Sequence, residues 1–426
     1  MLLLIVCCRI FQFIFGLCAH LLPWRKAALI AGAGAIEKIP SLLKDDGCLK
    51  PLLVTDSGLV KAGIASKLTK VLEKAGVSFI FFSEVEPNPS VITVNRIFEL
   101  YRNENCDSFI ALGGGSAMDA AKAAAARSVK PRKSVNQLGG LFKVLKKLPL
   151  FIAVPTTAGT GSETTVGALI TDTETHHKYA ILDLSLIPKY AVLDPELTVS
   201  LPPSITAATG MDALTHAVEA YLCWTFGNKE SRAFALDAVK AIFENIFKVY
   251  KNGADIEGRQ EMLVASYKAG FAFSRSAVGN IHAIAHTLGG LYNTPHGLAN
   301  AVILPIVLED YGKKVWKKLA YLSEVSGIAP ASNSDGSSSN SSSSNSSNSS
   351  NSIEEKAKAF INAIYNMNEK MGIPKGFDFI KEDDIPQITR WASKESNPLY
   401  PVPVVYNQAR FKKIIHKLGE GQANAK

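Results

Sequence analysis

The chain contains little cysteine, and its cysteines follow no recognisable pattern. There are six in 426 residues, at positions 7, 8, 18, 48, 106 and 223. No two of them form a CxxC pair, and three fall within the first eighteen residues. This spacing supports neither a disulfide framework nor a thiolate zinc site. A reducing compartment fits best, and we expect a cytoplasmic protein.

Charged residues are also sparse. They make up 20% of the chain against 47% hydrophobic residues, which is the balance of an ordinary globular protein. The formal net charge is +8, and short scattered basic runs such as 130–133 and 313–318 contribute to it. Such runs are typical of solvated helix faces, so we expect no nucleic-acid partner. The positive charge favours long-range attraction of an anionic cofactor.

The first 23 residues lack both acidic residues and serine. Met1–Pro23 is strongly apolar, is interrupted by Arg9 and His20, and is followed by Trp24, Arg25 and Lys26. Because about 20 apolar residues span a bilayer, the stretch is compatible with a membrane anchor. A targeting segment, for example a mitochondrial one, and extra sequence from a misplaced start are the alternatives. The arginine inside the stretch weakens the spanning interpretation.

Residues 24–200 show the alternation typical of an α/β domain. Short apolar runs alternate with amphipathic stretches of helical length, such as the one that carries Ile64, Leu68 and Leu72. This order indicates βαβ units and a parallel sheet. Residues Ala168–Leu182 resemble a hairpin whose turn contains His176 and His177, which we expect to be exposed. The predicted strands of the sheet are Ala28–Ala31, Leu52–Thr55, Phe79–Ser83, Phe109–Leu112, Leu150–Val154 and Ala191–Leu193.

Residues 201–426 carry no strand signal and are predicted to form an all-α domain. A Ser/Asn tract at 331–352 interrupts it and cannot bury enough apolar surface to offset its ordering entropy, so we expect a disordered insertion. The predicted helices are Ile205–Tyr221, Ser231–Tyr250, Gln260–Phe273, Asn280–Tyr292, Leu298–Tyr311, Val315–Ser326, Ile353–Met371 and Ala409–Leu418.

The segment Phe109–Asp119 predicts a phosphate site. A strand ends in three glycines, Ser116 stands at the expected N-cap position, and an alanine-rich helix follows. Glycines let the backbone approach phosphate oxygens, and a helix N-terminus supplies free amides and the positive end of its dipole. The alternative is a tight turn that needs glycine for its own conformation.

Asp56 indicates the choice of cofactor. It closes the strand in the segment LLVTD, where a carboxylate accepts hydrogen bonds from both ribose hydroxyls of adenosine and repels a 2′-phosphate. NAD is therefore expected rather than NADP. The acid precedes the glycine loop here, which is the reverse of the common dinucleotide fingerprint. The hydroxyl-rich segment Phe151–Glu163 supplies a second strand-to-loop edge, where Thr156, Thr157, Thr160 and Ser162 are candidates to hydrogen-bond phosphate or nicotinamide. By itself, this segment is equally compatible with a hydroxyl-rich turn.

Four histidines between residues 216 and 296 predict a metal site. Asp212 and His216 are four residues apart, so they share one helix face, and His282 and His286 repeat that spacing. His296 follows before a glycine. Imidazole and carboxylate ligands together suit iron(II) or zinc. A single core histidine needs no ligand role, but two histidine-bearing helices and a His-Gly turn favour one.

These segments together resemble the iron-containing (group III) alcohol dehydrogenases, from about Lys26 to Gly421. The resemblance implies a dinucleotide-binding α/β domain followed by a helical domain, the dehydroquinate synthase-like architecture, with the metal in the cleft between. The matching segments are VTD at 54–56, VEPNP at 85–89, GGGSAMD at 113–119, PTTAGTGSE at 155–163, DPELTVSLPP at 194–203, ATGMDALTHAVEAY at 208–221, HAIAHTLGGLYNTPHG at 282–297 and NPLYPVPV at 397–404.

The resemblance also implies roles for individual residues. The family's metal ligands correspond to Asp212, His216, His282 and His296, and its second cleft histidine to His286. Its cofactor contacts correspond to Asp56, Asn88, Gly114, Gly115, Ser116, Asp119, Thr156, Thr157 and Lys178. The apolar extension 1–23 and the Ser/Asn tract depart from the family pattern. Since the family's fold begins near Ala27, we expect the extension to have no core left to fill.

The expected reaction interconverts a primary alcohol and its aldehyde, or a ketone, by hydride transfer with NAD(H). The metal acts as a Lewis acid for the developing alkoxide, and His286 is the candidate proton carrier, with a structural role as its alternative. Three other hypotheses remain: a hydroxyacid–oxoacid transhydrogenase of the same family, a dehydroquinate synthase-like lyase, and a non-enzymatic scaffold. We expect a homodimer, attached to a membrane only if residues 1–23 are a retained anchor.

Overall fold

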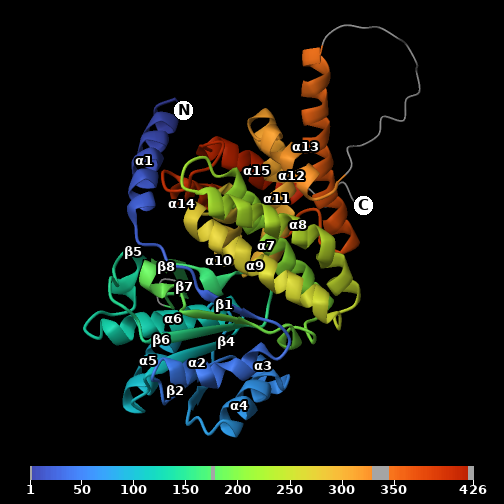
Figure 1. Ribbon diagram of the computed structural model, residues 1–426. Helices are drawn as coiled ribbons and strands as arrows, with labels where there is room; N and C mark the ends of the chain where they lie inside the picture. Colours follow the sequence, from blue (N-terminus) through green and yellow to red (C-terminus); the bar gives the residue numbers. More distant parts are fainter. Residues whose placement is uncertain (1, 174–177, 329–344, 421–426) are drawn as a thin grey trace. The chain divides into compact units, whose positions relative to one another are not determined.

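The chain divides into two compact units (Figure 1). The computed structural model describes residues 2–173, 178–328 and 345–420. The sheet unit consists of Pro23–Thr209 and Lys248–Ser274, and the helical unit consists of Met1–Leu22, Gly210–Phe247 and Arg275–Lys426.

The sheet unit contains a six-stranded, wholly parallel sheet, in the order β1-β9-β6-β4-β2-β3. This confirms the predicted parallel α/β fold. The middle strands β2 and β4 are buried on both faces, as the near-continuous apolar runs indicated. The strands are β1 (Ala28–Ala31), β2 (Pro51–Val54), β3 (Ile80–Phe82), β4 (Ser108–Gly113), β6 (Leu150–Pro155) and β9 (Tyr190–Leu193).

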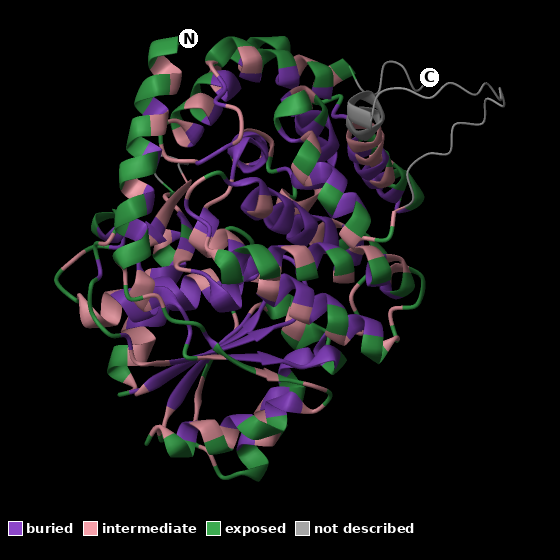
Figure 2. Ribbon diagram, turned by 45° about the horizontal axis from the view of Figure 1, so that its top comes forward, coloured by how far each residue is buried: buried purple, intermediate pink, exposed green. Residues whose placement is uncertain are grey.

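Helices cover both faces of this sheet, and Figure 2 shows its inner strands as buried. Phe109 and Ala111 of β4 lie in one core cluster, together with residues of α5 (Val91–Asn103) and α6 (Gly115–Val129). The alternating residues Ile110 and Leu112 lie in a second cluster, with residues of α2 (Ile39–Asp45) and α4 (Ile64–Lys74). The short helix α3 (Ser57–Lys61) follows β2. The period-two pattern of a strand thus supplies two separate cores.

A small second sheet lies in the same unit, in the order β5-β8-β7. Strands β7 (Gly167–Thr171) and β8 (Lys178–Leu182) pair antiparallel, which confirms the predicted hairpin. Its turn at 174–177, with His176 and His177, lies outside the described residues. Strand β5 (Gly140–Leu141) has two residues and was not predicted, because so short a strand has no periodicity to read.

The C-terminal half is helical, as predicted. Helix α10 has the predicted bounds, whereas α14 was not predicted. The described part of α13 begins at Asn345, so the last eight positions of the predicted insertion 331–352 are helical and positions 331–344 lie outside the described residues. The helices are α7 (Pro203–Leu222), α8 (Lys229–Lys251), α9 (Ile256–Ser276), α10 (Asn280–Tyr292), α11 (His296–Tyr311), α12 (Trp316–Val325), α13 (Asn345–Lys370), α14 (Ile385–Ser396) and α15 (Gln408–Glu420).

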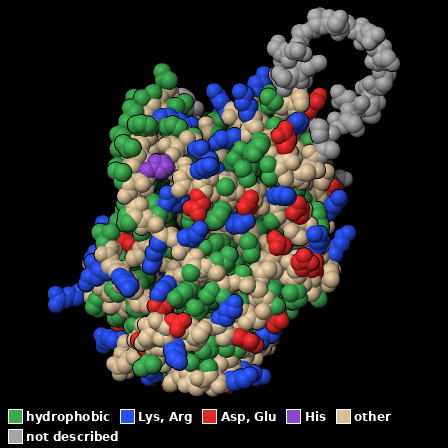
Figure 3. Space-filling view, viewed as in Figure 1, with side chains coloured by type: hydrophobic (Ala, Val, Ile, Leu, Met, Phe, Trp, Pro, Cys, Tyr) green, Lys and Arg blue, Asp and Glu red, His purple; other side chains and the backbone are tan. Residues whose placement is uncertain are grey.

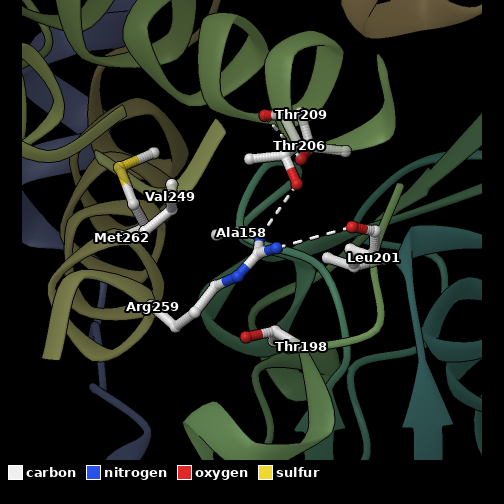
Figure 4. A pocket seen from close by; sticks show the side chains of 8 residues that line it. All are labelled: Ala158, Thr198, Leu201, Thr206, Thr209, Val249, Arg259 and Met262. Atoms are coloured by element: carbon white, nitrogen blue, oxygen red, sulfur yellow. Dashed lines mark hydrogen bonds between the residues drawn. The ribbon is translucent and has the colours of Figure 1, made fainter. Parts of the chain in front are cut away.

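Helix α9 belongs to the sheet unit, although a single boundary near residue 200 would place it with the other helices. Its buried Arg259 lines a small cavity and donates to Thr206 Oγ1 (2.8 Å) and to the Leu201 carbonyl (3.5 Å) (Figure 4). Tyr267 donates its hydroxyl to the carbonyl of Ala27 (2.6 Å). These hydrogen bonds fix α9 to the segment before β1 and to the segment after β9.

Residues 1–23 are not an unattached extension. Helix α1 (Leu2–Leu21) belongs to the helical unit, and Cys8 is buried in one cluster with Val402 and Val405. The expectation that this apolar stretch has no core to fill is therefore wrong. The sequence could not reveal this, because the surface that receives α1 comes from the other end of the chain.

Candidate active site

The four predicted metal ligands come together inside the helical unit. Asp212 and His216 lie one turn apart on α7, His282 lies on α10, and His296 is the first residue of α11. One ligand atom from each lies within 4.8 Å of the ligand atoms of the other three. Asp212, His216 and His282 are buried, and His296 is partly exposed. A carboxylate and three imidazoles around one point are a donor set for a divalent transition metal.

Glu219 holds one of these histidines in place. It lies on the same face of α7 as Asp212 and His216, two turns beyond the aspartate, and is buried. The carboxylate oxygen Oε2 of Glu219 lies 2.6 Å from His282 Nδ1. Its two oxygens also accept the backbone amides of Gly279 and Ile281, both at 2.9 Å. Glu219 therefore caps the N-terminus of α10 and orients His282 at the same time.

This arrangement requires glycine at position 279. A Cβ atom there would lie 2.5 Å from Glu219 Oε1, which is closer than any real contact. Burial raises the pKa of the Glu219 carboxyl to about 7, while the amides of Ile281 and Gly279 act in the opposite direction. The close approach of α10 thus supplies the hydrogen bonds that favour the anionic form.

His282 is held neutral with its hydrogen on Nδ1. Burial lowers its pKa well below the usual value, and the neighbouring His216 and His296 lower it further. Because Nδ1 donates to Glu219, the lone pair of the neutral ring is on Nε2. A neutral imidazole with a free lone pair is the form that binds a metal ion.

Asn300 shows that these lone pairs converge. It lies one turn after His296 on α11 and is buried. Its amide nitrogen lies 2.7 Å from Asp212 Oδ1, 3.0 Å from His282 Nε2 and 3.2 Å from His296 Nε2. Three acceptor atoms around one donor nitrogen are what a cation site requires, so the residues fit a divalent ion. Sequence reasoning missed both Asn300 and Glu219, although each continues the helical spacing of a predicted ligand.

His286 lies beside the four converging residues rather than among them. Its ring stacks on that of His296, with the ring centroids 5.1 Å apart. Its Nδ1 lies 2.6 Å from Glu395 Oε1, and the same oxygen accepts the hydroxyl of Tyr400 at 2.8 Å. Glu395 comes from α14, the helix that the sequence did not predict, so its role was missed too. The pair orients a histidine next to the candidate metal centre.

In the sheet unit, the glycine loop forms the predicted strand-to-helix turn between β4 and α6. Gly113 has φ +153°, and a Cβ there would lie 2.7 Å from that of Ala117. A Cβ on Gly115 would lie 2.9 Å from the Thr160 side chain. Both positions therefore require glycine, and the turn leads directly into the N-terminus of α6, where a helix favours an anion.

Three predicted cofactor residues gather at this turn. The N-cap of α6 is Gly114 and not Ser116, because the backbone is already helical from Gly115. The Ser116 hydroxyl instead accepts a hydrogen bond from the backbone amide of Asn88 at 3.3 Å. Lys178 donates its ammonium group to Asn88 Oδ1 at 2.7 Å. Asn88 has a positive φ of 58°, so a tight backbone turn brings it to the helix N-terminus.

Asp56, Thr156 and Thr157 lie at the carboxyl ends of β2 and β6, the two strands that flank β4 in the sheet. Asp56 Oδ1 accepts the Leu59 amide (2.9 Å) and caps α3. Its Oδ2 lies 3.6 Å from the position of a Cβ on Gly113, so the carboxylate faces the glycine loop. Thr156 bonds the Gly113 carbonyl through its amide (3.0 Å).

Asp119 contacts the segments that follow β6 rather than the glycine loop. Its two oxygens accept the Ser162 hydroxyl (2.8 Å) and the Leu169 amide (3.0 Å). The fully buried Lys122 donates to the carbonyl of Ser162 (2.5 Å) and to that of Thr165 (3.1 Å). Burial lowers the pKa of Lys122 to about 8. Sequence reasoning missed Lys122, although its spacing from Asp119 places both near one helix face.

Comparison with known proteins connects both units to one family. Residues 27–195 match the family model described as iron-containing alcohol dehydrogenase. Residues 206–419 match the model of the C-terminal part of the Fe-containing alcohol dehydrogenase family. The two matches cover most of the chain and leave α1 outside.

Individual relatives agree with these matches. The chain is 34% identical over 382 residues to an NAD-dependent methanol dehydrogenase of Bacillus methanolicus, covering 87% of this chain and 94% of the relative. It is 36% identical over 370 residues to a 1,3-propanediol dehydrogenase of Citrobacter freundii, covering 86% and 90%. The solved structure of a 1,3-propanediol oxidoreductase has a TM-score of 0.84 at 33% identity, over 93% of this chain and all of that one.

Proposed function

Because the chain belongs to the iron-containing alcohol dehydrogenase family, we propose that it interconverts a small primary alcohol and its aldehyde by hydride transfer with NAD(H). The observation that carries the proposal is the convergence of Asp212, His216, His282 and His296 on one point. A small substrate is favoured because the relatives include a methanol dehydrogenase, a 1,3-propanediol dehydrogenase and a lactaldehyde reductase.

We assign the four converging residues as ligands of a divalent ion, iron(II) by family and zinc as the alternative. When bound, the ion supplies Lewis-acid stabilisation of negative charge on the substrate oxygen. Glu219 keeps His282 in the tautomer that a ligand needs. His286, held by Glu395, is the candidate catalytic residue that passes the alcohol proton toward solvent.

We assign the cofactor to the carboxyl edge of the parallel sheet. Gly114, Gly115 and Ser116 would receive the pyrophosphate at the start of α6. Asp56 would accept the ribose hydroxyls, while Asn88 and Lys178 bring a donor and a cation to the same turn. Thr156 and Thr157 extend this edge. Asp119 contributes by bracing the loop, so its effect on NAD is indirect.

Replacing Asp56 with asparagine should shift the cofactor preference toward NADP. Asparagine is one of the best N-cap residues, so it still caps α3. Its neutral amide, however, no longer repels a 2′-phosphate. We expect the NAD/NADP ratio of kcat/KM to fall by about tenfold or more, the equivalent of one charge-assisted hydrogen bond. Steady-state kinetics with both cofactors measure this ratio. An unchanged ratio would mean that Asp56 does not meet the ribose.

The proposed function is tested with a panel of small alcohols and aldehydes, after anaerobic reconstitution with iron(II) or zinc. NADH formation that depends on added metal supports the proposal. Turnover of a hydroxyacid and an oxoacid without free NAD would instead identify a transhydrogenase. No NADH from any alcohol, in protein that retains metal and NAD, would overturn the proposal.

Assembly and location are proposals of the same kind. We propose a homodimer, since β1 is an edge strand with mostly exposed residues. We propose a cytoplasmic enzyme, because all six cysteines are free thiols in the structure.

A further inference from the structure

Helix α1 has a polar contact with the rest of the helical unit that its apolar composition hides. Its buried residues are Cys8, Gln12, Gly16 and Ala19, at spacings of four, four and three, so they form one face. A Cβ on Gly16 would lie 2.9 Å from Thr225 Oγ1, which shows how closely this inner face packs. The family match begins at residue 27, so these contacts are additional to the shared fold.

Gln12 is the centre of this inner face. Its side chain is completely buried, and its amide nitrogen donates to the carbonyls of Pro398 (3.0 Å) and Tyr400 (2.7 Å). Its amide oxygen accepts the indole N–H of Trp224 at 2.8 Å. Arg9 continues the contact by donating to the carbonyl of Val402 at 2.8 Å. Removing Gln12 would leave several buried groups without partners, which is more costly than losing an exposed contact.

The segment that Gln12 holds also reaches the candidate catalytic histidine. The hydroxyl of Tyr400 donates to Glu395 Oε1 at 2.8 Å, and this oxygen lies 2.6 Å from His286 Nδ1. A continuous set of hydrogen bonds therefore runs from Gln12 through the backbone and side chain of Tyr400 to Glu395 and His286. Every member lies in the helical unit.

We propose that Gln12 is a positioning residue for His286, acting through Tyr400 and Glu395. The inference rests on the proposed function, in which His286 carries a proton. Helix α1 then contributes to turnover without touching substrate or cofactor. Its contribution is the fixed orientation of the Glu395 carboxylate, which in turn selects the His286 tautomer with hydrogen on Nδ1.

The test compares Gln12→Met, which keeps the length of the side chain but makes no hydrogen bond, with Gln408→Met, the same change at an exposed position of α15. We expect Gln12→Met to lower kcat about fivefold, because residues that act through a neighbour without touching substrate have effects of this size. The KM for NAD and the metal content should stay unchanged. Tyr400→Phe should give a similar loss. In a His286→Gln background, Gln12→Met should have no further effect.

Multiplicative losses in the Gln12→Met/His286→Gln double variant would overturn the proposal, as would equal losses in Gln12→Met and Gln408→Met. If the full chain forms no NADH with any alcohol, the proposed function has failed. The positioning role is then judged by the rate at which diethyl pyrocarbonate modifies His286, read by peptide mass mapping. That rate should rise in Gln12→Met, and an unchanged rate contradicts the positioning role.

The outer face of α1 is a separate feature. It exposes large apolar side chains along its whole length, and Figure 3 shows hydrophobic atoms over the visible side of α1. Among the described residues, this is the helix long and apolar enough to span a membrane by length and composition. The exposed side chains are Leu2, Leu3, Val6, Ile10, Phe11, Phe13, Ile14, Leu17 and Leu21, with exposed fractions from 40% to 82%. A monomer in water rarely keeps so continuous an apolar strip uncovered.

Composition indicates what covers this strip. Helix α1 contains no acidic residue, and its arginine, Arg9, donates to the carbonyl of Val402 in the same unit. A continuous apolar face without negative charge matches the headgroup boundary of a membrane. Because Gln12 and Arg9 attach the inner face to the helical unit, the helix would lie along the surface rather than span it.

We infer that the outer face of α1 binds the surface of a lipid bilayer. In flotation assays, the full chain should bind vesicles of phosphatidylcholine. Ile10→Ser with Leu17→Ser should lower binding about tenfold or more, since two buried aliphatic side chains contribute that much. The matched control is Ile92→Ser with Leu49→Ser, on similarly exposed positions of the sheet unit.

Three results would overturn this inference. One is equal loss of binding in the control variant. Another is concentration-dependent self-association that disappears in Ile10→Ser with Leu17→Ser, which would assign the strip to a second copy of the chain. The third is an intact mass that lacks residues 1–23, which would identify a cleaved segment.

Discussion

Replacing His282 with alanine is expected to abolish metal binding and alcohol oxidation together while the protein stays folded. The substitution removes one of four converging ligand atoms and opens the centre of the donor set. Since disturbing only an outer partner costs 10–100-fold in metal affinity or activity, losing a ligand should cost more than about 100-fold. Elemental analysis gives the metal content, and NADH formation gives the activity.

The fold should survive this change because the partner of His282 keeps other hydrogen bonds. Glu219 still accepts the amides of Gly279 and Ile281, so the start of α10 remains capped. His416→Ala on α15, which is not near the donor set, is the matched control and should retain metal and activity. A His282→Ala protein with its full metal content would show that the metal is held elsewhere, and the assignment of all four ligands would fail.

The sequence predicted the metal ligands because they follow local rules. Asp212 and His216 are one helical turn apart, and a carboxylate and an imidazole at that spacing share a face whatever the rest of the fold does. The same rule extends to Glu219 and to Asn300, each one turn beyond a predicted ligand. Their roles were not readable, because they depend on how closely α10 and α11 approach α7. That approach depends on Gly279, whose missing side chain carries no signal by itself.

Other parts of the site depend on contacts between distant parts of the chain. Glu395 is separated from His286 by 109 positions, and it lies on a helix whose apolar stripe is short. Helix α1 was predicted only as an apolar stretch, because hydropathy does not say which face meets protein. Its single buried amide side chain, Gln12, was not singled out in the sequence, yet it makes three hydrogen bonds to the rest of the helical unit. A polar residue inside an apolar segment is therefore expected to have buried hydrogen-bond partners elsewhere in the fold.

Replacing Glu219 with glutamine is expected to weaken metal binding about 10- to 100-fold, the range measured for outer partners of metal-binding histidines. The amide has the same shape, but it removes the negative charge beside His282 Nδ1 and keeps only one of the two acceptor oxygens. The imidazole then becomes a weaker electron donor, and the new NH2 group faces an N–H donor in place of an acceptor. Competition with a chelator measures the dissociation constant, and Glu244→Gln at an exposed position of α8 is the control.

A second variant separates orientation of His282 from capping of α10. In Gly279→Ala the new methyl group would lie 2.5 Å from Glu219 Oε1, so it displaces the carboxylate without changing its charge. If Glu219 acts by holding His282, both variants should lose metal affinity, Glu219→Gln through the lost charge and Gly279→Ala through the displaced carboxylate. If Glu219 serves only as a cap, melting temperature should fall in both while the metal dissociation constant stays at the wild-type value. That second pattern would remove Glu219 from the account of the metal centre, because a cap stabilises the helix whether or not its histidine faces an ion.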